Sequence, residues 1–423
     1  MANAKAFNRL QRFKLDKDGH TSSRFCLLVL ITFCAIACLG TYAASAQHSV
    51  AEFHNILREK AAFDQVDFAA LEQGETVVRL LPPKDKREVA VCGLVSLKVP
   101  AEVFLHSFLE SMARKSNPAI LEIGKFSSAP TLDELKGLTI ENRDLDDLKE
   151  CIVGDCRVKL SAAMIERFRK EIDFEAPDYP IRATQLLRLM LLEYVRDYLV
   201  QGDAALIEYN DKSKEVRLAE EQRALIAGST YINNVLPDFP QHLKDFRKSG
   251  ISIVEDAIVW SKIKFGLKPV IAINHIIVYK REHETGPQVL IASKQIYANH
   301  YFDSSLALTA FGNIPGAGAG SYLFYENRSR ADGLEGAFSG IKRGIVEDKA
   351  VAGLKTILET SKATLNARRL TGADSVSDSN QGGGGWKRWK VKRAHLFLSL
   401  FLITAFAALF TLGNYNWRRG ISG

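Results

Sequence analysis

The chain has 423 residues, of which 47% are hydrophobic and 25% charged, a composition that is typical of a globular protein and excludes wholesale disorder. Its net charge of +7 comes from the two ends, because residues 1–24 balance at +4 and residues 386–423 at +7. Subtracting both from the total leaves −4 for residues 25–385, so the body offers no basic surface for nucleic acid.

Residues 1–46 predict a targeting segment. Phe25–Ala46 is an uncharged stretch behind a basic leader, and its end, Ala44-Ser45-Ala46, is typical of a secretory cleavage site. The same stretch is long enough to remain as an uncleaved anchor. We therefore predict an exported protein whose residues 1–46 form a signal peptide or a signal anchor.

Residues 47–160 form a first predicted α+β segment. Thr76–Leu81 and Glu88–Val99 are apolar, rich in β-branched residues and separated by a Pro-containing turn, so both are predicted strands. Pro100–Lys115 is a predicted helix, because proline suits the first helical turn. Asp144, with Asp147 three residues later, is typical of a helix start.

Three cysteines lie beyond the targeting segment. Cys151 and Cys156 flank a Gly-Asp turn, and an oxidising compartment would allow a disulfide between them, although their spacing leaves the reduced pair equally open. Cys92 lies in an apolar strand, where core packing is favoured over a reactive thiol. The chain contains no C-x-x-C and no H-E-x-x-H, so neither a metal site nor a cofactor is predicted.

Residues 161–266 are predicted to be helical. Apolar side chains recur there at helical spacing, as in Leu186, Leu189, Met190, Tyr194 and Val195. A partner-docking surface on this segment would make the protein an envelope scaffold or interaction protein, which is the alternative function.

Residues 267–370 predict an antiparallel meander followed by an amphipathic helix. Short connections join the four predicted strands, which are Pro269–Arg281, Gln288–Phe302, Ser305–Phe311 and Ser321–Arg328. The helix runs from about Gly340 to Leu365, and its stripe consists of Val351, Leu354, Leu358, Leu365 and the one polar member Ser361. Such a stripe is expected to cover the preceding sheet.

The C-terminus predicts a membrane anchor. Residues 371–393 are a polar, basic-ended linker, residues 394–413 lack any formal charge and are flanked by aromatic side chains, and residues 414–423 are a short basic tail. These features predict a single-pass or double-pass protein of the cell inner membrane with a periplasmic or otherwise extracytoplasmic body. The basic residues before the last helix oppose the positive-inside tendency, which leaves a cytosolic body open.

The predicted fold class is therefore α+β: an antiparallel meander packed on a long C-terminal amphipathic helix, with a helical insertion and a C-terminal transmembrane helix. Across residues 75–120 and 265–366, this order of elements resembles the START-like, or SRPBCC, helix-grip superfamily. There a curved antiparallel sheet wraps the last helix and encloses an apolar cavity. The resemblance implies binding of a lipid or another apolar ligand, and the motifs identify no catalytic residue.

Polar residues of the meander are the candidate ligand site. The second strand carries five at alternate positions and therefore on one predicted face, namely Ser293, Gln295, Tyr297, Asn299 and Tyr301. With neighbouring strands, the candidate ligand-binding residues are Asn274, Gln295, Tyr297, Asn299, Tyr301, Tyr325 and Asn327. Inside a cavity they would orient the polar end of a ligand, whereas on the outer face they would be solvated. The predicted partners are membrane lipids or an apolar small molecule, and no nucleic acid.

Overall fold

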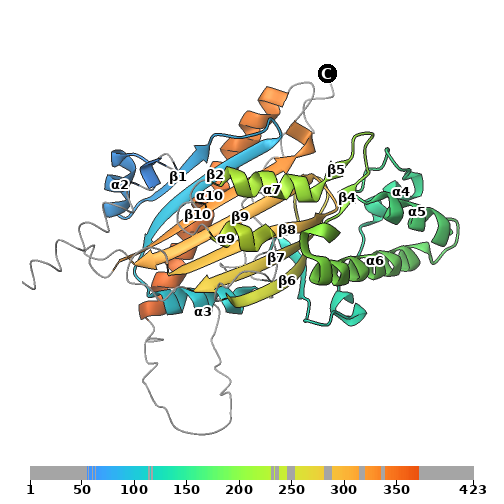
Figure 1. Ribbon diagram of the computed structural model, residues 1–423, viewed down its shortest axis with the longest axis horizontal. Helices are drawn as coiled ribbons and strands as arrows, with labels where there is room; N and C mark the ends of the chain where they lie inside the picture. Colours follow the sequence, from blue (N-terminus) through green and yellow to red (C-terminus); the bar gives the residue numbers. More distant parts are fainter. Residues whose placement is uncertain are drawn as a thin grey trace, which may run out of the picture.

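The computed structural model shows an α+β fold built around one large antiparallel sheet (Figure 1). It describes residues 55–370 except 56, 60, 62, 113–114, 116–117, 230–232, 234–237, 245–252, 281–287, 314–319 and 335–338. The sheet has eight strands in the order β1-β2-β10-β9-β8-β7-β6-β3. Their bounds are β1 Thr76–Leu81, β2 Glu88–Leu97, β3 Ile120–Lys125, β6 Ile253–Ile263, β7 Val270–Lys280, β8 Val289–Ala298, β9 Phe302–Asn313 and β10 Ser321–Ala331.

The predicted meander corresponds to the consecutive neighbours β7, β8, β9 and β10. The predicted strand pair in the first segment corresponds to β1 and β2, which join the same sheet beside β10. A two-stranded ribbon, β4 (Glu208–Tyr209) with β5 (Val216–Arg217), lies apart from it. The first and last predicted segments thus contribute to one sheet.

The helical prediction for residues 161–266 does not hold at β6. Residues 253–263 form a strand that pairs with β7 on one side and β3 on the other. Val259 and Ile263 pack on one face of the sheet, and Ile258 and Trp260 on the opposite face. A strand buried on both faces has no polar–apolar alternation, so its period could not be distinguished from that of a buried helix.

Different helices cover the two faces of the sheet (Figure 1). One face, called the α10 face below, packs against α10 (Ser339–Leu370) over β1 and β2 and against α3 (Ala101–Ser111) over β9. The opposite face, called the α7 face, is covered by three groups of helices. They are α2 (Gln65–Glu72); α7 (Leu218–Gly228) with α9 (Asp238–Lys244); and α4 (Asn142–Glu150), α5 (Ala162–Glu171) and α6 (Tyr179–Gln201). Short 3-10 turns lie at Leu132–Leu135, Gly202–Ala205 and Asp332–Leu334.

The stripe of α10 packs against the sheet, and all of its members except the partly buried Val351 are fully buried. Leu354, Leu358, Ser361 and Leu365 are each 0% exposed. A Cβ atom at Gly93 of β2 would lie 2.5 Å from Cδ1 of Leu358, so a larger residue there would have to displace the Leu358 side chain. The helix and the sheet therefore form one core, of which Ser361 is a buried polar member.

In the part of the chain that the structure describes, no helix is both long and apolar enough to cross a membrane. The long helices α6 and α10 carry charged side chains along their lengths, such as Arg188 in α6 and Lys355 in α10, which a bilayer would not accommodate cheaply. The transmembrane helix in the predicted fold class and the predicted inner-membrane location are therefore wrong for the described chain. The targeting segment 1–46 and the segments 371–393, 394–413 and 414–423 lie outside the described residues.

Candidate functional site

Neutral polar side chains occupy the middle of the α10 face. Asn274 of β7 lies between Ala272 and Ile276, which both belong to the apolar core of this face. Opposed residues of antiparallel strands point to the same face, and Asn274 is opposed by Gln295 of β8. The same pairing brings in residues of β8, β9 and β10. The polar patch, as we call it, consists of Asn274, Ser293, Gln295, Thr309, Tyr325 and Asn327, all of them buried.

Four of the seven residues predicted to bind a ligand lie in this patch: Asn274, Gln295, Tyr325 and Asn327. They come from β7, β8 and β10, so the sheet gathers residues that are more than 50 positions apart in the sequence. The other three candidates lie elsewhere, for a reason that is local to β8.

A β-bulge in β8 separates Gln295 from Tyr297. Asn274 pairs with Gln295 while the adjacent Ile273 pairs with Tyr297, so Ile296 is an extra residue and the alternation of faces shifts by one. The backbone groups that the bulge frees are bound by tyrosines: the Ile296 carbonyl accepts from Tyr194 at 2.5 Å, and the Ala298 amide donates to the Tyr209 hydroxyl at 2.8 Å. The bulge therefore has a defined position.

Gln295 is also fixed from the side of α7. The Nε2 atom of Gln222 donates to the carbonyl oxygen of Gln295 at 2.7 Å and to that of Ser305 at 3.1 Å. These carbonyls lie just beyond Lys294–Leu306, the last pair of the β8–β9 ladder. With one face of the strand held in this way, the Gln295 side chain is directed to the α10 face.

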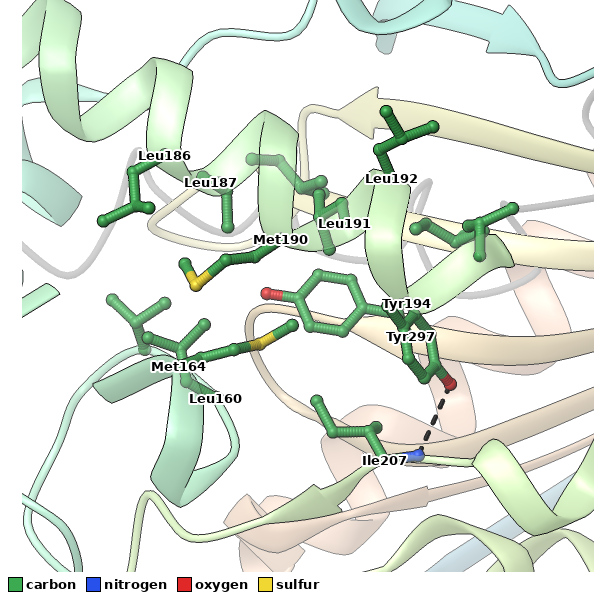
Figure 2. Close-up of a cluster of buried hydrophobic side chains, with 14 of the residues drawn as sticks. Leu160, Met164, Leu186, Leu187, Met190, Leu191, Leu192, Tyr194, Ile207 and Tyr297 are labelled. Atoms are coloured by element: carbon green, nitrogen blue, oxygen red, sulfur yellow. Dashed lines mark hydrogen bonds between the residues drawn. The ribbon is translucent and has the colours of Figure 1, made fainter. Parts of the chain in front are cut away.

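Tyr297 lies on the α7 face rather than in the predicted ligand site. Figure 2 shows its ring among Met190, Leu191 and Tyr194 of α6, inside the core of the helical segment. Its hydroxyl donates to the Lys159 carbonyl at 3.3 Å, and burial raises its pKa. The contribution of Tyr297 is therefore to attach the helical segment to the sheet.

Asn299 and Tyr301 belong to a polar cluster around α4. Asp144 accepts from His300 Nε2 at 3.0 Å, from Lys268 at 2.9 Å and from Asn299 Nδ2 at 3.4 Å. Burial raises the pKa of Asp144, but the hydrogen bonds from His300 and Lys268 outweigh it, so the pKa is lowered. Tyr301, at φ +62°, accepts from the amides of Leu267 and Lys268 and so fixes the turn that carries Lys268.

The predicted helix start near Asp144 is displaced as well. The helix α4 begins at Asn142, with Glu141 at the N-cap, so Asp144 and Asp147 lie within it and face the sheet. The sequence could not distinguish a capping aspartate from one buried against a lysine 124 positions away.

The polar patch is only partly satisfied by hydrogen bonds. At one end, Ser329 Oγ donates to Asn327 Oδ1 at 2.9 Å and shares a 2.8 Å hydrogen bond with Ser305 Oγ. Burial raises the pKa of Tyr325, so its phenol remains a neutral donor. By contrast, Gln295 Nε2 is buried and has no partner within the described part of the chain.

Two serines on the same face are unpartnered as well. Ser261 of β6 is opposed by Ala272 of the α10 face, and Ser361 belongs to the buried stripe of α10. Both side chains are 0% exposed, and neither Oγ atom has a hydrogen-bond partner among the described residues. The layer beneath α10 and α3 therefore contains polar atoms without partners, surrounded by apolar side chains.

Charged side chains are buried on the α7 face instead. Arg328 donates to Glu326 at 2.7 Å and to Glu88 at 2.6 Å, and Arg330 donates to Glu221 at 2.7 Å. Burial raises the pKa of Glu326, although Arg328 and Ser229 oppose that rise. Two of these groups, Glu88 and Arg330, also have an unpartnered atom, but each is held by at least one ion pair. This network is consistent with a structural role.

Cys151 and Cys156 form a disulfide with a Cα–Cα distance of 4.4 Å. The Gly154 amide within its loop donates to the Asn210 carbonyl at 2.8 Å, which ties the end of α4 to the β4–β5 ribbon. Cys92 is a buried free thiol whose pKa is raised by burial. Across the described ranges, no group of three or more His, Cys, Asp or Glu side chains is placed to hold a metal ion.

No protein-family model matches the chain, and comparison with curated proteins and with solved structures gives no significant match.

Proposed function

We propose that this protein binds a ligand with an apolar body and a polar end in the layer between the α10 face and helices α3 and α10. The observation that supports this proposal is the set of unpartnered buried atoms: Gln295 Nε2, Ser261 Oγ and Ser361 Oγ. The large majority of buried side-chain polar atoms in folded proteins are hydrogen-bonded. Leaving one unsatisfied costs about 1–3 kcal/mol, so a partner that the chain itself does not provide is expected.

The surroundings of these atoms suit an amphiphilic ligand. Ile276, Ile291 and Phe311 belong to the apolar core of the same face and flank the patch along β7, β8 and β9. Apolar walls with a few convergent polar groups are the usual lining of a small-molecule site. Ile276 and Phe311 are 0% exposed, and Phe311 stacks on Phe104 of α3 at 4.5 Å. The apolar part of the ligand would therefore contact these side chains once α3 moves aside, and its polar end would bind Gln295.

Native mass spectrometry on the purified full-length chain tests the proposal. After incubation with a total lipid extract, the intact mass should exceed the denatured mass, and the difference should extract as a defined lipid. A protein that stays bare after this incubation, while circular dichroism shows it folded, would contradict the proposal.

A pair of variants shows where the ligand binds. Gln295→Leu removes the unpartnered donor and should lose most of the bound ligand without losing the fold. Gln185→Leu makes the same change on the exposed surface of α6 and should keep it. Equal binding by the wild type and both variants would place the ligand outside the patch.

A further inference from the structure

The patch differs from the rest of the buried polar structure in carrying no charge. Its members are amides, hydroxyls and a phenol. The buried cations of the strands, Lys262, Lys294, Arg328 and Arg330, occupy α7-face positions. All are held by carboxylates, as in the pairs Lys294–Asp203 and Lys262–Glu141.

Among the described residues, the charged groups of the α10 face lie at its borders. Lys125 pairs with Glu255 at the β3–β6 edge, and Lys280 at the end of β7 pairs with Glu102 of α3 at 3.6 Å. Lys362 of α10 donates to the Gly74 carbonyl next to β1. In the described strands and helices, no cation is therefore placed to neutralise an anion bound at Gln295.

We infer that the ligand is electrically neutral and presents an acceptor oxygen to Gln295 Nε2, as a long-chain alcohol, an ester or an acylglycerol does. This inference rests on the proposed function and narrows it to one class of ligand. An ionised carboxylate or phosphate would have to leave water for a site without a counter-ion, which costs several kcal/mol even in a relaxed protein. A hydroxyl or an ester carbonyl pays a smaller desolvation cost, and its hydrogen bond with Gln295 satisfies both groups.

Two probes with the same acyl chain isolate the charge of the polar end. 1-Monooleoylglycerol is neutral, whereas oleate is ionised at pH 8, and both are titrated into the full-length protein below the concentrations at which they aggregate. Native mass spectrometry should give a dissociation constant at least about tenfold lower for the neutral probe, which corresponds to about 1.4 kcal/mol.

The variant Gln295→Lys supplies the missing cation and should reverse this preference. Oleate binding should strengthen and monooleoylglycerol binding should weaken, whereas Gln295→Leu should weaken the binding of monooleoylglycerol without improving that of oleate. Circular dichroism establishes that each variant is folded. If the lysine variant does not fold, the two probes on the wild-type protein decide the question by themselves.

The outcomes separate the two proposals. A preference for monooleoylglycerol that reverses in Gln295→Lys supports both. Oleate bound as tightly as monooleoylglycerol by the wild type would overturn the inference about charge and leave ligand binding standing. A protein that binds neither probe and no component of a lipid extract would overturn both.

Discussion

The two faces of the sheet bury polar groups in different ways. On the α7 face the buried groups are largely charged and paired: Arg328 lies between Glu326 and Glu88, and Lys159 donates to Asp303 at 2.9 Å. On the α10 face they are neutral, and Gln295, Ser261 and Ser361 have unpartnered atoms among the described residues. Each strand contributes side chains to both faces in alternation. The residue types at alternate positions along a strand therefore determine the difference between the faces.

This contrast distinguishes buried polar groups that stabilise the fold from buried polar groups that could bind a ligand. A buried charge is tolerated only when a partner of opposite charge is present, and each charged group of this network has at least one ion-pair partner within the folded chain. A neutral donor without a partner is cheap enough to keep and remains available to a ligand. Unpartnered neutral atoms occur on the α7 face as well, at Gln222 Oε1 and Ser304 Oγ, so the feature that distinguishes the α10 face is the absence of buried charge among its described residues. That absence agrees with the proposed binding of a neutral ligand there.

The largest expected effect comes from breaking the paired face. Arg328→Met leaves Glu88 and Glu326 buried without their shared cation and should lower the free energy of unfolding by about 3–5 kcal/mol. The matched control is Arg167→Met, which removes a partly exposed arginine that also binds two carboxylates, those of Glu171 and Glu193. Its effect should stay below about 1 kcal/mol. Urea unfolding followed by circular dichroism measures both, and similar losses would show that the buried network is no more important than a surface one.

A pair of identical substitutions compares the faces directly. Ser229 Oγ donates to Glu326 at 2.9 Å beneath the α7 face, so Ser229→Ala should destabilise the protein by about 1.5–3 kcal/mol. Ser361→Ala removes an unpartnered hydroxyl from α10 and introduces the best helix former, so it should leave stability unchanged or raise it by up to about 1 kcal/mol. Both are measured in ligand-free protein by urea unfolding. Equal changes in the free energy of unfolding for the two variants would contradict the proposed difference between the faces.

The sequence was sufficient for elements whose pattern is local. The strand β7 is an apolar run between turn signals, and β8 to β10 each contain a shorter apolar run. The stripe of α10 follows from the 3,4 spacing of Leu354, Leu358 and Leu365. Their antiparallel order follows because short connections can only join neighbouring antiparallel strands. β6 was missed because both of its faces are buried, by residues that lie far away in the sequence.

The candidate site was predictable only up to the bulge. Strict alternation along β8 placed Gln295, Tyr297 and Asn299 on one face, and the extra residue Ile296 made this wrong for the last two. The bulge is stabilised by Tyr194 and Tyr209, which are 102 and 89 residues away from the backbone groups they bind. Nothing within β8 encodes it. Ser261 was missed with β6, and Thr309 could have been found by continuing the alternation of β9 two residues beyond Ala307.

The smallest expected effect is the pH dependence of stability, to which the α7 face should contribute and the polar patch should not. His275 of the α7 face lies 2.6 Å from Asp256 Oδ1 through Nε2 and 2.9 Å from the Tyr198 hydroxyl through Nδ1. Burial lowers its pKa below 6.5, although Asp256 opposes this. Below about pH 6.5 the unfolded chain therefore takes up a proton that the folded chain does not, and stability falls. Between pH 7.5 and pH 5.5 this loss is at most about 1.4 kcal/mol.

The variant His275→Gln should reduce this loss of stability. The control His106→Gln, which replaces an exposed histidine, should not reduce it. Urea unfolding at the two pH values measures both changes. The polar patch contains no group that titrates in this range, so the affinity for monooleoylglycerol should stay constant while the folded protein becomes less stable. An affinity that follows the protonation of His275 would mean that the two faces are coupled through β7, and the separation of a structural face from a binding face would then have to be abandoned.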